Sequence, residues 1–151
     1  MPGTMLILRG ITNLKVWPKY PNGALDEPPA LEYARKRGYT GRVLDVSGET
    51  GDGSLQTRRA LQEFIHDSTI TALYGFSGGG YNTYHILNRL PEEQRNRLEL
   101  VVVLGVDPKN LSAHALNANR YSAHWELVYR NDPPRPLTHI DGPRALLAEL
   151  P

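Results

Sequence analysis

The sequence predicts an α/β protein in which a mostly parallel, five-stranded sheet lies between two layers of helices. Two observations support this class. Short apolar, β-rich runs alternate along the chain with segments of helical periodicity. One run, "LELVVVLGV" at residues 98–106, is almost wholly apolar, which is typical of a central parallel strand covered on both faces. The length of 151 residues, without a repeat or a long linker, fits a single domain over residues 1–151.

The individual elements follow from local patterns. The strands are expected at residues 5–8, 42–46, 70–76, 98–106 and 124–129. Helices are expected within residues 27–38, 53–67, 79–90 and 142–150, between or after the strands. The second helix has Ser54 as its expected N-cap, and its apolar residues gather on one face.

Composition excludes several classes of function. The 17 Lys and Arg are interspersed with 16 Asp and Glu, so the chain has no basic face of the kind that binds nucleic acid. Cysteine is absent, which excludes disulfides, thiolate nucleophiles and Cys-based metal sites. The N-terminal apolar run before Arg9 is too short for a signal peptide or a membrane span. We therefore expect a cytoplasmic protein. No pattern predicts its oligomeric state.

A glycine-rich segment, "LYGFSGGG" at residues 73–80, joins the third predicted strand to the next helix. It contains the pattern Gly-x-Ser-x-Gly, with Ser77 at its centre. Flanking glycines allow a sharp turn between strand and helix, which would expose the Ser77 hydroxyl at the end of the sheet. The first turn of the helix would direct its N–H groups and positive dipole end to the same place, where they favour a developing oxyanion.

Other polar residues follow the later strands. In open α/β sheets, functional groups gather at the carboxyl ends of the strands. Asp107 follows the fourth predicted strand, Asp132 follows the fifth, and His139 comes shortly afterwards. A Ser, an Asp and a His are the side chains needed for nucleophilic acyl transfer.

With these residues the sequence resembles the α/β-hydrolase superfamily of esterases, lipases and thioesterases. The resemblance is to a reduced form of the fold, because residues 5–8 look like the third strand of the family and no apolar run separates Asp132 from His139. This compact outline is most similar to cutinase-type and small lipase-like members. The resemblance implies Ser77 as nucleophile and His139 as general base. It implies the N–H groups of Gly78 and the loop near Ile11 as oxyanion donors, and neither a cofactor nor a metal.

The acid of the triad has two candidates. The position most common in the family corresponds to Asp132, whereas "LGVDPK" resembles a lipase variant in which Asp107 is the acid. We expect Asp107, because it would lie one strand from Ser77 and Asp132 two strands away, with neighbouring strands about 4.8 Å apart. The prolines in "DPPRPLTH" also predict an extended segment that hinders a return of His139 to Asp132.

The expected function is therefore hydrolysis of a small carboxylic ester or thioester through a Ser-His-Asp triad and an acyl-enzyme. Two other classes stay open. A glycine-rich helix N-terminus also binds phosphate or nucleotides, although this segment lacks both the P-loop lysine and the Gly-x-Gly-x-x-Gly spacing. The fold could also be a catalytically silent scaffold, with Ser77 a plain turn residue. The histidines other than His139 are not spaced as metal ligands.

Overall fold

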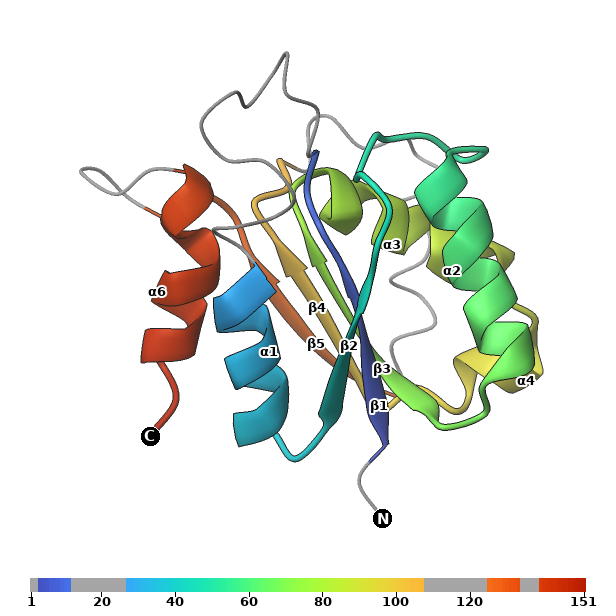
Figure 1. Ribbon diagram of the computed structural model, residues 1–151, viewed down its shortest axis with the longest axis horizontal. Coiled ribbons are helices and arrows are strands. Elements are labelled where there is room, and N and C mark those ends of the chain that lie inside the picture. The colour runs from blue at the N-terminus through green and yellow to red at the C-terminus, as the bar shows by residue number, and fades with distance from the viewer. Residues whose placement is uncertain (1–2, 12–26, 108–124, 134–138) are drawn as a thin grey trace.

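Five strands form one sheet in the computed structural model, which describes residues 3–11, 27–107, 125–133 and 139–151 (Figure 1). Every neighbouring pair of strands is parallel. Across the sheet the strands are β2 (Thr40–Leu44), β1 (Thr4–Leu8), β3 (Ile70–Phe76), β4 (Leu100–Leu104) and β5 (Glu126–Arg130). The predicted α/β class is confirmed, with all five strands parallel.

Helices cover both faces of this sheet. One face packs against α1 (Glu27–Lys36) and α6 (Gly142–Ala148), and the other against α2 (Leu55–His66) and α3 (Gly78–Arg89). Figure 1 shows the two pairs on opposite sides. The four predicted helices are confirmed, and Ser54 caps α2 by accepting a hydrogen bond from the Thr57 N–H. Two short elements were not predicted, α4 (Glu92–Arg95) and the 3-10 turn η4 (His139–Asp141). Both are too short for their sequences to show the hydrophobic periodicity of a helix.

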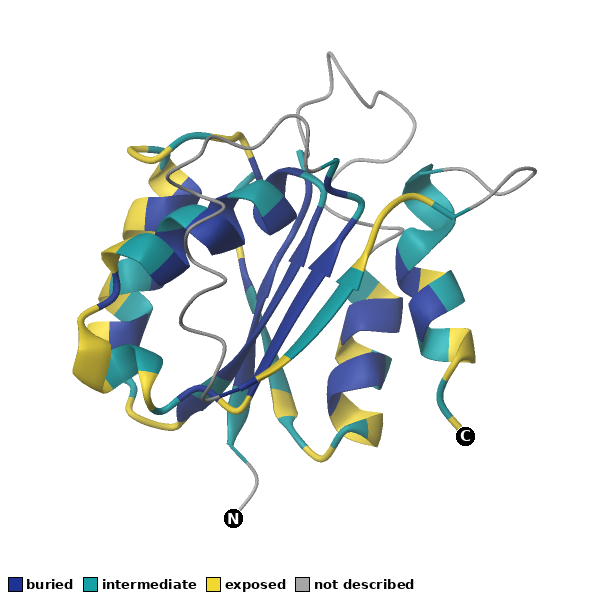
Figure 2. Ribbon diagram, turned by 180° about the vertical axis from the view of Figure 1, so that it is seen from behind, coloured by how far each residue is buried: buried dark blue, intermediate teal, exposed yellow. Residues whose placement is uncertain are grey.

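The core follows the alternation of side chains along each strand. In β1, Leu6 and Leu8 pack with Phe64 of α2, whereas Met5 and Ile7 pack with Tyr33 of α1. All five residues of β4 are buried, as expected for a strand covered on both faces (Figure 2). None of the described helices is long and apolar enough to span a membrane.

The strand order positions the site. From β1 the chain moves to β2 on one side of the sheet, and β3 then lies on the other side of β1. Connections that leave two adjacent strands in opposite directions open a crevice at their carboxyl ends, where doubly wound proteins bind ligands. This switch point lies between β1, which is followed by Arg9-Gly10, and β3, which is followed by Ser77.

Candidate active site

Ser77 occupies a strained turn between β3 and α3. Its φ of 55° makes it the only described residue other than glycine with a positive φ. Such backbone conformations cost about 1–3 kcal/mol and are concentrated at functional sites. The Ser77 N–H donates to Leu104 O at 2.8 Å, and the Ser77 carbonyl accepts from the Tyr81 N–H at 3.0 Å. The hydroxyl makes no capping hydrogen bond to α3. Helix capping therefore does not explain the serine.

The outer glycines of the motif allow α3 to approach the sheet closely. A Cβ atom on Gly75 would lie 2.3 Å from Thr83 Oγ1 and 2.4 Å from Gly79 O. A Cβ atom on Gly79 would lie 2.3 Å from Leu8 O, at the end of β1. Because these distances are far below van der Waals contact, larger residues would push α3 away from β1 and β3. The pattern Gly-x-Ser-x-Gly thus has a steric origin in this fold.

The ring of His139 lies next to the serine turn. It stacks on Phe76, the residue before Ser77, with ring centroids 4.9 Å apart and an interplanar angle of 26°. It also lies against Gly105, which follows β4, since a Cβ atom there would be 2.6 Å from His139 Cε1. Gly105 has a φ of 66°, so both its backbone conformation and this contact favour glycine. The structure therefore brings η4 over the ends of β3 and β4.

Asp132 is a hydrogen-bonding partner of His139. Its Oδ1 atom is bonded directly to His139 Nδ1, and the Asp132 side chain is half exposed. A carboxylate can only accept, so Nδ1 carries a proton, and in the neutral imidazole of this tautomer Nε2 keeps its lone pair. Asp107 contacts α3, because its backbone N–H donates to the Tyr81 hydroxyl at 3.2 Å. This geometry favours Asp132, the alternative acid, over the expected Asp107.

The expectation of Asp107 counted strands across the sheet and did not consider where η4 lies relative to Asp132. Asp132 lies just beyond β5, and η4 lies over the neighbouring strand ends, so the two side chains meet without crossing the sheet. The prolines of residues 133–136 do not prevent this return. Residues 134–138 lie outside the described part of the chain.

The two predicted oxyanion donors lie beside each other near Ser77. A Cβ atom on Gly10 would be 3.4 Å from Ser77 Cβ, which places the end of β1 against the serine. A Cβ atom on Gly78 would be 3.2 Å from Ile11 Cγ1. The Gly78 N–H belongs to the first helical turn, which has no partners within the helix. Ile11 and Gly78 thus lie next to each other, beside Ser77.

Some expected features are not brought together. Among the described contacts, none is a hydrogen bond between the Ser77 hydroxyl and His139. No group of three His, Asp or Glu in the described ranges could hold a metal ion. Tyr84 is buried in the core, and burial raises the pKa of its hydroxyl to about 12. His114, His124 and the loop around Trp17 lie outside the described residues.

Sequence reasoning missed the side chains that anchor the strand ends. Arg9 is 8% exposed and pairs with Glu27 at the start of α1 and, at 2.7 Å, with Asp45 after β2. Gln56 and Asn82 are fully buried between α2, α3 and the ends of β1 and β2. A glutamine in the first turn of a helix and an asparagine in another helix have the pattern of surface residues. No feature of the sequence distinguishes them.

In comparisons with known proteins, no family model matches this sequence, and no curated protein matches it. The arrangement of Ser77, His139 and Asp132 is therefore interpreted from its own chemistry. A serine on a strained turn, an imidazole with a free Nε2 and a carboxylate on Nδ1 are the parts of a nucleophile and its base. A nearby pair of backbone N–H groups is the part that binds an oxyanion.

Proposed function

We propose that this protein is a serine hydrolase that cleaves a small carboxylic ester or thioester through an acyl-enzyme. Ser77 is the nucleophile, His139 the general base and Asp132 the acid. One observation supports the proposal most strongly. Ser77 is the only described non-glycine residue with a positive φ, and the ring of Phe76 beside it stacks on His139. The His139 imidazole is in turn hydrogen-bonded to Asp132. A plain turn would need none of these partners.

The reaction follows from these positions. Ser77 Oγ attacks the carbonyl carbon of the substrate while its proton passes to His139 Nε2, and Asp132 stabilises the imidazolium that forms. The N–H groups of Gly78 and Ile11 stabilise the negative oxygen of the tetrahedral intermediate. Its collapse breaks the C–O or C–S bond, and His139 gives its proton to the departing alcohol or thiol. Water then attacks the acyl-enzyme in the same way, which releases the acid and restores Ser77.

This mechanism requires His139 Nε2 to reach the Ser77 hydroxyl. The imidazole lies on Phe76 and Gly105, immediately beside the serine turn. In enzymes without substrate, catalytic hydrogen bonds are often long or poorly aligned, and they tighten when substrate binds. We therefore expect a small movement of His139 or a rotation of the Ser77 side chain in the substrate complex.

Two cavities lie near the carboxyl ends of the strands. A cavity of about 250 Å³ lies beside the His139–Asp132 pair and is lined by Asp132, Gly142 and Leu146, among others. A second, of about 340 Å³, adjoins the loop after β2 and includes Val46, Glu49 and Leu55. Sites for drug-sized ligands range from about 300 to 1,000 Å³. Neither Ser77 nor His139 lines either cavity, so short acyl chains are proposed from the small size of the chain and not from these volumes.

The test combines labelling with turnover. A fluorophosphonate probe should add one label to the wild-type protein, located at Ser77 by peptide mass spectrometry. Short-chain p-nitrophenyl esters should be hydrolysed faster than long-chain esters. Ser77→Ala should lose both activities while its melting temperature changes little, and Ser47→Ala, at the same edge of the sheet, should keep both. Turnover by a folded Ser77→Ala variant would refute the proposal. An unlabelled wild type that binds nucleotide would favour the phosphate-binding alternative.

A further inference from the structure

Two buried amide side chains lie behind the predicted oxyanion site. Gln56 of α2 and Asn82 of α3 are both 0% exposed. The Gln56 amide nitrogen donates to two backbone carbonyls, Arg9 O at 3.0 Å and Val46 O at 3.1 Å. These carbonyls follow β1 and β2. A single side chain thus ties together the ends of two adjacent strands.

Asn82 extends this contact into the loop after β2. Its amide nitrogen donates to Gln56 Oε1 at 2.8 Å and to Glu49 O at 3.0 Å, and its Oδ1 accepts from the Gly51 N–H at 3.1 Å. All four amide N–H donors of the pair are therefore used. Turning the Gln56 amide over would place its oxygen against two carbonyl oxygens, so the network fixes one orientation. A buried amide stabilises only when it is satisfied in this way.

The loop held by this pair contains Gly48, which is pressed between β1 and α3. Its N–H donates to Gly10 O at 3.0 Å, and its own carbonyl oxygen would be 1.7 Å from a Cβ atom on Gly78. In a planar trans peptide the C=O and the following N–H point in opposite directions. The hydrogen bond from Gly48 to Gly10 O therefore fixes the Gly10–Ile11 peptide with the Ile11 N–H pointing away from the loop. Gln56 fixes the preceding peptide, Arg9–Gly10, through its hydrogen bond to Arg9 O. The Ile11 N–H donates to no other described group.

We propose that Gln56, supported by Asn82, is a positioning residue that orients the Ile11 and Gly78 N–H groups toward the oxyanion. This inference rests on the proposed hydrolase function. Oxyanion donors act through preorganisation, since they must already point at the developing charge. A displacement of about 1 Å in such a group can reduce the rate about 100-fold. Gln56 touches neither Ser77 nor His139 in the described contacts, so its effect passes through the backbone.

The test uses Gln56→Glu, which keeps the shape but replaces the NH₂ donor with an oxygen facing two carbonyls. We expect kcat for p-nitrophenyl acetate to fall about 10- to 100-fold while KM stays within about twofold of wild type. Phenylboronic acid, whose boron bonds to Ser77 Oγ in a tetrahedral adduct, should bind Gln56→Glu more weakly than wild type. The loss of boronate affinity should equal the loss in kcat/KM. Gln56→Met has a side chain of similar length without a hydrogen-bond donor, and it should show the same losses as Gln56→Glu. It provides a second variant if Gln56→Glu does not fold.

Phe64→Leu is the matched control, since it weakens packing in the same helix without touching a strand-end carbonyl. It should lower the melting temperature and leave kcat and boronate affinity unchanged. The inference is overturned, and the hydrolase function kept, if both Gln56 variants match wild type in kcat and boronate affinity. If the wild type neither hydrolyses esters nor reacts with a fluorophosphonate, the proposed function fails and the inference with it.

Discussion

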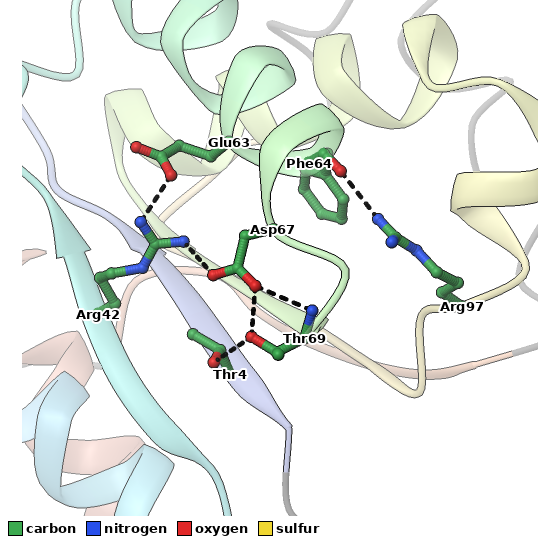
Figure 3. A network of polar contacts seen from close by, with 7 residues as sticks. All are labelled: Thr4, Arg42, Glu63, Phe64, Asp67, Thr69 and Arg97. Atoms are coloured by element: carbon green, nitrogen blue, oxygen red, sulfur yellow. Dashed lines mark hydrogen bonds and ion pairs between the residues drawn. The ribbon is translucent and has the colours of Figure 1, made fainter.

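The two ends of the parallel sheet are built in different ways. At the amino end, charged and hydroxyl side chains connect the elements. Arg42 of β2 bonds to Glu63 at 2.6 Å and to Asp67 at 2.9 Å, and Asp67 in turn holds Thr69 (Figure 3). Thr69 contacts Thr4, at the start of β1, and Arg97 donates to Phe64 O at 3.0 Å. Apart from the Phe64 carbonyl, these groups belong to residues that are partly or fully exposed.

At the carboxyl end, the connections run through backbone groups and buried amides, together with the ion pairs of the buried Arg9 with Glu27 and Asp45. Ser77 has a strained backbone, Gly75 and Gly79 allow close approach of α3, and Gln56 binds two strand-end carbonyls. Exposed ion pairs contribute little stability each, typically up to about 1 kcal/mol. A strained turn costs stability and persists only because its surroundings hold it. We infer from this difference that the side chains at the amino end contribute only to stability, whereas the carboxyl end forms the proposed active site.

The largest expected effect separates the two candidate acids, Asp132 and Asp107. Asp132→Asn keeps the size but favours the wrong His139 tautomer, so ester hydrolysis should fall by about three to four orders of magnitude. Asp107→Asn is the matched control and should stay within about threefold of wild type. Steady-state kinetics on both variants provide the measurement. The reverse ranking would restore Asp107 as the acid.

The next effect tests whether the carboxyl end depends on glycine. Gly75→Ala would place a methyl group against Thr83 Oγ1 and Gly79 O, so we expect a loss of about 2–4 kcal/mol in the free energy of unfolding. Gly53→Ala is the control, because nothing lies within 4 Å of its Cβ position. Denaturant unfolding measures both. Equal stability of the two variants would show that α3 can move away from β3 at little cost.

The smallest effect concerns the amino end. Asp67→Ala should cost about 1 kcal/mol and leave hydrolysis unchanged, since it removes only partly exposed contacts. Hydrogen bonds from the Thr69 side chain and N–H lower the pKa of Asp67, so its contribution is present above about pH 4 and is lost as the pH falls through that lowered pKa. Acid unfolding of wild type should therefore be steeper than that of the variant. A change in kcat would contradict the division between the two ends.

Local patterns in the sequence predict most of the fold. The limits of β3 are those expected, because Gly and Ser follow an uninterrupted β-rich run. Ser54 caps α2 as expected, since N-capping depends on neighbouring residues alone. The turn at Ser77 is likewise encoded within five residues.

The site depends on contacts between distant segments, and these could not be predicted. His139 meets Asp132 because η4 lies over the ends of β3 and β4, and no local pattern encodes that placement. Gln56 and Asn82 are polar residues in helices, where periodicity suggests exposure. Only the packing of α2 and α3 against the strand ends shows that they are buried.

The rate at which a fluorophosphonate labels Ser77, in wild type and in His139→Ala, tests the central claim most directly. If His139 activates a serine held at the carboxyl end of the sheet, the wild type should acquire one label at Ser77, and His139→Ala should react at least about 100-fold more slowly. Circular dichroism should show that the variant keeps its fold. Equal labelling rates in the two proteins, or no label at Ser77 in wild type, would contradict the claim.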